Sequence, residues 1–168
     1  REKIGQLEGK VAELIRFGEE NDEIGEKVHR LGLALLEADT YPVLRDVLFQ
    51  SLVEDFSVPY VALRIWNVPL SHDEDDFLPV SEALCFQAGD MRHPYCGAPG
   101  HIEVLGWLGE AAPHVRSVAL IPLRRDAQVF GLLALASEDG ERFYPEMGTL
   151  YLTRIGDLTA AALRRELG

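Results

Sequence analysis

Two apolar runs separated by a short polar segment dominate the pattern of this 168-residue chain. The first run covers residues 118–123 if Pro122 is counted, and the second covers residues 129–136 with Gly131 as its one permissive position. The polar segment between them is typical of a β-hairpin with a longer loop. Neither run alternates with polar residues, which predicts strands buried on both faces of a sheet.

Helical periodicity dominates residues 1–37, which we predict to form one long helix. An apolar heptad seam begins the helix and then shifts by three residues, a change that locally overwinds a coiled coil. Glycines recur every seven residues and suggest close helix approach. A helix packed on its own domain and a dimerisation or signalling helix both fit this pattern, because a seam this long needs a partner. The seam and the glycines are Ile4, Leu7, Val11, Leu14, then Phe17, Ile24, Val28, Leu31 and Leu35, with Gly18, Gly25 and Gly32 beside them.

The remaining chain alternates between elements and loops. Asp39 and Thr40 before a proline predict the start of a helix over residues 42–56, and residues 61–66 alternate as a strand with two different faces. The acidic stretch 72–76 is interpreted as a solvated loop, because it lacks the ligand spacing of a calcium loop. A short helix is expected from about residue 79, residues 86–100 are expected to be irregular, and Pro145 is expected to begin the last helix.

Composition and charge narrow the classes of function. Apolar residues make up 47% of the chain, enough for a core, and the net charge is −12. This charge argues against nucleic acid and anionic membrane surfaces as partners. No stretch approaches the roughly 20 apolar residues of a membrane span. With only two cysteines a disulfide framework is not indicated, and we expect a cytoplasmic protein.

Residues with chemical interest gather between Cys85 and His101. Two cysteines and two histidines in this stretch lack the paired short spacing of a zinc site, so we assign no metal. Cysteine catalysis needs a base near the thiol, and sequence proximity of His93 or His101 to Cys96 does not establish one. We therefore assign no catalytic residue, and the sequence names no cofactor.

Three segments carry a resemblance to a known family: Tyr95–Gly97, Ser117–Leu123 and Arg142–Leu150. They are similar to the proteobacterial GAF-like family called domain of unknown function 484, with a match over residues 21–163. The resemblance implies an α+β fold with an antiparallel sheet of five or six strands, helices on one face and a pocket on the other. It also implies terminal helices that pair between subunits. GAF modules commonly bind small ligands such as cyclic nucleotides, tetrapyrroles or metabolites.

The resemblance and the residues together predict a long coiled-coil-like helix over residues 1–37 and a GAF-like domain over residues 38–168. We expect a non-enzymatic sensory or interaction module that binds a small molecule and forms a homodimer. The alternatives are a thiol-dependent redox enzyme using Cys85 and Cys96, and a structural dimerisation domain without a ligand. The GAF-like enzymes that reduce free methionine sulfoxide use three cysteines, whereas this chain has two. Candidate ligand-binding residues, expected opposite the helical layer, are Arg64, Trp66, Phe86, Tyr95, Cys96 and His101.

Overall fold

A computed structural model describes the backbone of residues 2–168 and the side chains from residue 4 onward, apart from Phe17. Arg1 and the predicted seam side chain of Phe17 therefore lie outside the described residues. The elements, in chain order, are α1 (Glu2–Glu37), α2 (Tyr41–Glu54), β1 (Tyr60–Ile65), η1 (Asp75–Phe77), α3 (Glu82–Asp90), β2 (Tyr95–Gly97), α4 (Ile102–Gly106), η2 (Gly109–His114), β3 (Ser117–Arg125), β4 (Gln128–Ser137) and α5 (Leu150–Leu167).

The predicted hairpin forms the centre of an antiparallel sheet with the strand order β1-β4-β3-β2. The α+β class is confirmed, but the described residues form four strands where five or six were expected. The prediction of a longer polar loop between the two hairpin strands is also wrong. Arg125 pairs with Gln128, so two residues form the turn, and Asp126 adopts a left-handed φ of 53°. Both central strands are buried on both faces, as their unbroken apolar runs predicted.

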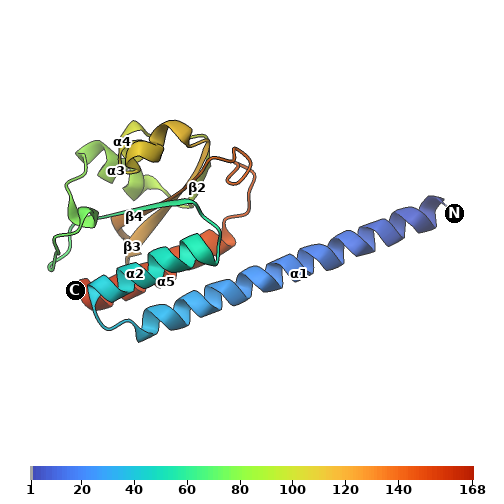
Figure 1. Ribbon diagram of the computed structural model, residues 1–168, viewed down its shortest axis with the longest axis horizontal. Helices are drawn as coiled ribbons and strands as arrows, with labels where there is room; N and C mark the ends of the chain where they lie inside the picture. The colour runs from blue at the N-terminus through green and yellow to red at the C-terminus, as the bar shows by residue number, and fades with distance from the viewer. Residues whose placement is uncertain (1) are drawn as a thin grey trace.

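Helices lie on both sides of the sheet, which corrects the expectation of helices on one face (Figure 1). The helices α1, α2 and α5 share one core with the sheet, built around side chains such as Leu63, Ile121 and Leu133. The short helices α3 and α4 cover the other face, where Leu84 and Val104 pack with Leu120. The sheet therefore separates two apolar cores, and little of its surface is left uncovered.

Capping and proline signals in the sequence predicted some helix ends correctly and others incorrectly. The Thr40 side chain caps α2 by accepting a hydrogen bond from the backbone N–H of Val43 at 3.4 Å, which confirms the predicted start. The last helix begins at Leu150 rather than at Pro145, since a turn closed by a hydrogen bond from Met147 N to Tyr144 O precedes it. Residues 86–100 are not wholly irregular, because they contain the end of α3 and the strand β2.

The acidic loop is exposed at His72, Asp73 and Asp75, as expected, but is anchored at Asp76. Asp76 is 1% exposed and accepts hydrogen bonds from the Tyr41 hydroxyl and, at 2.6 Å, from Arg45 Nε. The Tyr41 ring also stacks on His72, with ring centroids 4.8 Å apart. The interpretation of residues 72–76 as a solvated loop was therefore wrong at Asp76. Local composition does not reveal that a hydroxyl and a guanidinium of α2 compensate its burial.

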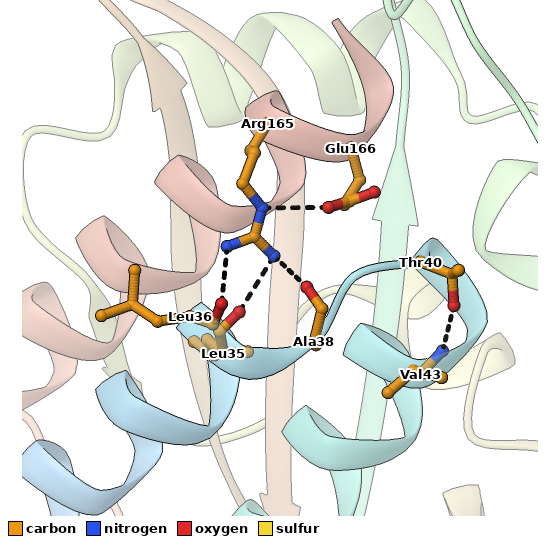
Figure 2. A network of polar contacts seen from close by, with 7 residues as sticks. All are labelled: Leu35, Leu36, Ala38, Thr40, Val43, Arg165 and Glu166. Atoms are coloured by element: carbon orange, nitrogen blue, oxygen red, sulfur yellow. Dashed lines mark hydrogen bonds and ion pairs between the residues drawn. The ribbon is translucent and has the colours of Figure 1, made fainter.

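A single arginine ties the end of α1 to α5 (Figure 2). The guanidinium of Arg165 donates hydrogen bonds to the backbone oxygens of Leu35 at 2.9 Å, Leu36 at 3.5 Å, and Ala38. These carbonyls lie at the C-terminal end of α1, where helical acceptors have no partner within the helix and cations are favoured. This contact fixes the C-terminal half of α1 on the folded body.

Candidate ligand-binding site

Arg64 is the most unusual polar residue of the sheet. It lies on β1, facing the core that α3 and α4 cover, and is only 9% exposed. Its Nη1 donates to the backbone oxygen of Leu63 at 2.9 Å, and its guanidinium carbon lies 5.0 Å from the ring centroid of Trp107. It forms no ion pair with any residue whose side chain the structure describes. Arg64 is thus a desolvated cation with hydrogen-bond donors to spare.

Electrostatics around Arg64 are unbalanced. Burial lowers the pKa of the guanidinium below its ordinary value, and the charges of Asp76 and Asp75 oppose this effect from a distance. A carboxylate, phosphate or carbonyl group beside Arg64 would restore the interactions that burial removes.

The structure brings some of the other candidates together. Trp66 follows β1 on the same side as Arg64 and packs half-buried against the same core. Tyr95 and His101 contact each other edge to face, with ring centroids 5.6 Å apart, and the Tyr95 hydroxyl donates to the backbone oxygen of Ala98 at 2.7 Å. Phe86 lies on the outer side of α3 and is 73% exposed.

Cys96 lies on the wrong side of the sheet for the expected pocket. Its side chain belongs to the core beneath α1, α2 and α5, whereas Arg64 faces α3 and α4. Cys85 lies on α3, so the sheet separates the two thiols. Burial raises the pKa of both thiols. Within the described range, no three or more His, Cys, Asp or Glu side chains form a group that could hold a metal ion.

Trp107 is the residue that the candidate set lacked. Its ring stacks on the Arg64 guanidinium although 43 positions separate the two residues in the sequence. Periodicity carries no information on such a distant contact. The one available signal was chemical, because a tryptophan face is a common partner for a buried arginine.

The described residues form an α+β domain around a four-stranded antiparallel sheet. The family model described as "Protein of unknown function, DUF484" matches residues 1–166, and the chain belongs to this family. A comparison with curated proteins found no match. No helix in the described part of the chain has the length and apolar character needed to cross a membrane.

Two proteins are among the solved structures to which this chain is similar. One is the free methionine-R-sulfoxide reductase of Neisseria meningitidis in complex with its substrate, with a TM-score of 0.56, 18% identity, and coverage of 84% of this chain and 90% of the reductase. The other is the GAF domain of the potassium sensor histidine kinase KdpD of Escherichia coli, with a TM-score of 0.45, 16% identity, and coverage of 84% and 93%. At 18% identity, the likeness to the reductase shows a shared fold.

Proposed function

We propose that this chain is a non-enzymatic sensory or interaction module, with a dimerising helix over residues 1–37 and a small-molecule-binding GAF-like domain over residues 38–168. The observation that carries the proposal is the uncovered apolar stripe on the N-terminal half of α1. Its seam residues Ile4, Leu7, Val11 and Leu14 are 53–69% exposed. A stripe of this length on a soluble helix indicates a partner.

The packing of α1 explains where this stripe becomes uncovered. Helices α1 and α5 run parallel: the Tyr151 hydroxyl donates to Asn21 O at 3.2 Å, and Arg165 donates to Leu35 O at the other end. Before residue 21 the helix α5 has not yet begun, so residues 2–20 extend past the body (Figure 1). At a rise of about 1.5 Å per residue, this extension is about 28 Å long.

A second copy of the same helix is the partner that the spacing favours. The 3-4-3 spacing of the exposed seam is that of a two-stranded coiled coil. The heptad position of Ile4 and Val11 is occupied farther along α1 by Gly18, Gly25 and Gly32. An added Cβ at Gly32 would touch the side chain of Leu158 in α5 at 3.6 Å. The C-terminal part of this stripe therefore packs on α5 of its own chain. The N-terminal part is free to pack on α1 of a second copy related by a twofold axis.

The face around Arg64 supports the binding part of the proposal. A small molecule with an anionic or carbonyl group would use the spare donors of Arg64, while Trp66 and Trp107 offer aromatic surface. Tyr95, on the edge strand opposite β1, and its neighbour His101 remain predictions from the sequence. The raised pKa of both thiols and their separation by the sheet favour binding over the alternative of cysteine redox chemistry.

Light scattering tests dimerisation. The wild-type mass is expected at about twice 18.7 kDa, and a Leu7→Glu/Leu14→Glu variant is expected to be monomeric because four carboxylates would meet in an apolar seam. A Gln6→Glu/Gly9→Glu variant adds the same charge at exposed positions away from the seam and is expected to remain dimeric. A monomeric wild type, or a dimer that survives both seam substitutions, would refute the dimer.

Native mass spectrometry of protein from its source tests for a retained small molecule. An Arg64→Ala/Tyr95→Ala variant is expected to lose the thermal shift that the released molecule causes. An unchanged shift would remove both residues from the site. Reduction of free methionine sulfoxide by wild type but not by Cys96→Ser would instead establish the enzymatic alternative.

A further inference from the structure

A cavity of about 760 Å³ lies between α1 and the turn that precedes α5. Its walls come from α1, the end of α2, β4, the turn residues around Arg142, and the first turn of α5. Ligand sites in proteins commonly have volumes of about 300–1,000 Å³, so the cavity is large enough for a small organic molecule. It lies on the side of the sheet that α1, α2 and α5 cover and is therefore distinct from the face around Arg64, which α3 and α4 cover.

The lining of this cavity combines apolar surface with one sign of charge. Lys27 of α1 and Arg142 of the turn line it, and none of the lining residues is an Asp or Glu, although the chain carries 28 of these. Most of the remaining wall is apolar, with Phe56, Met147 and Leu150 among its residues. Such a surface complements a molecule with an apolar body and a negative group.

Arg142 is the chemical centre of the cavity. It is half-buried, its Nη2 donates to Phe56 O at 3.0 Å, and its guanidinium carbon lies 4.7 Å from the Phe143 ring centroid. It forms no ion pair with a residue in the described part of the chain. Burial lowers the pKa of Arg142 below its ordinary value, and the charge of Asp139 opposes this effect only in part.

The first turn of α5 adds the same electrostatic sign. Leu150, Tyr151 and Leu152 line the cavity, and their helix has neither a side-chain cap at Thr149 nor an acidic residue in its first turn. The backbone N–H groups of a first helical turn have no partner within the helix and carry the positive end of its dipole. The first turn of α5 therefore adds to the positive potential that Lys27 and Arg142 create in the cavity, and it does not define the site alone.

We propose that this cavity binds an amphipathic anion, whose carboxylate or phosphate group contacts Arg142 and Lys27 and whose apolar body contacts Phe56, Met147 and Leu150. Because Lys27 belongs to α1 and Arg142 to the turn before α5, the bound molecule joins the long helix to the body of the domain. This inference is independent of the dimer and of the Arg64 face.

Isothermal titration calorimetry with decanoate and decyl phosphate tests the site, with decanol as the uncharged control. We expect saturable binding of the two anions at one molecule per chain and weaker binding of decanol. Arg142→Gln is expected to lower the affinity for both anions by about tenfold or more, which is the range for loss of a charged hydrogen bond. Lys27→Gln is expected to lower the affinity for the anions by a smaller factor than Arg142→Gln does. Arg116→Gln removes the same charge from an exposed arginine outside the cavity and is expected to bind as wild type.

Two further variants keep the proposal testable if Arg142→Gln does not fold. Gly148 lines the cavity and an added Cβ there meets nothing within 4 Å, so Gly148→Leu is expected to occupy free space and weaken all three ligands. The Leu7→Glu/Leu14→Glu chain is expected to bind decanoate whether or not the wild type is a dimer. Absence of saturable binding, equal affinity for decanol, or equal losses in Arg142→Gln and Arg116→Gln would overturn the site. Binding that disappears with the seam substitutions would also overturn it, by placing the ligand between copies.

Discussion

Gly156 is the position where adding one methyl group should be most costly. It lies on α5 directly above β3, and an ideal Cβ at this position would be 2.6 Å from Ile121 Cγ2 and 3.7 Å from Pro122 O. Real carbon atoms do not approach to 2.6 Å, so Gly156→Ala must displace α5 or the Ile121 side chain. Because Ile121 is buried in the main core, neither can move freely.

The magnitude follows from two opposing contributions to the free energy of unfolding. Alanine is more favourable than glycine in a helix by about 1 kcal/mol. Overpacking a close-packed core costs about 1–3 kcal/mol, which gives a net destabilisation of up to about 2 kcal/mol for Gly156→Ala. Gly25 of α1 has nothing within 4 Å of an added Cβ, so Gly25→Ala carries only the helix gain. The two variants should therefore differ by about 1–3 kcal/mol.

Urea unfolding of both variants at several protein concentrations measures this difference while controlling for association. A double-mutant cycle with Ile121→Leu sharpens the assignment, because leucine lacks the methyl group that Gly156→Ala would strike. We expect Gly156→Ala to cost less in the Ile121→Leu background than in wild type. If Gly156→Ala stabilises the protein as much as Gly25→Ala does, or the cycle shows no coupling, the close contact between α5 and β3 is refuted.

Two other predictions concern Arg165 and Cys96. Arg165→Met should lower the free energy of unfolding by about 1.5–3 kcal/mol, nearer the lower value because its side chain is 37% exposed. Arg165→Lys should recover part of the lost free energy of unfolding, measured by urea unfolding. An Arg165→Met variant as stable as wild type would contradict a stabilising contact between Arg165 and the end of α1. Burial raises the pKa of the Cys96 thiol, so the unfolded thiol ionises first, from about pH 8.5, and stability should fall as pH rises further through the folded pKa. Cys96→Ala should reduce this slope in urea titrations at high pH, and an unchanged slope would count against a buried neutral thiol.

The chain itself determined the elements that local patterns encode. The apolar runs of the hairpin predicted two strands buried on both faces, because burial on both faces leaves no polar alternation. The Thr40 cap was readable because a helix start needs a side-chain acceptor within three residues. Alternation along β1 correctly put Arg64 and Trp66 on one face, since successive side chains of a strand point to opposite sides.

Tertiary structure decided what lies on each face. The pairing of β2 with β3 turned Cys96 toward the long helices, and packing of distant segments brought Trp107 onto Arg64. The burial of Asp76 and the cavity beside Arg142 likewise arise from segments far apart in the chain. Periodicity reports which way a side chain points relative to its own element, and not which element will cover it. The fold class, the hairpin and the long helix could therefore be predicted from sequence, whereas the composition of the candidate sites depended on long-range packing.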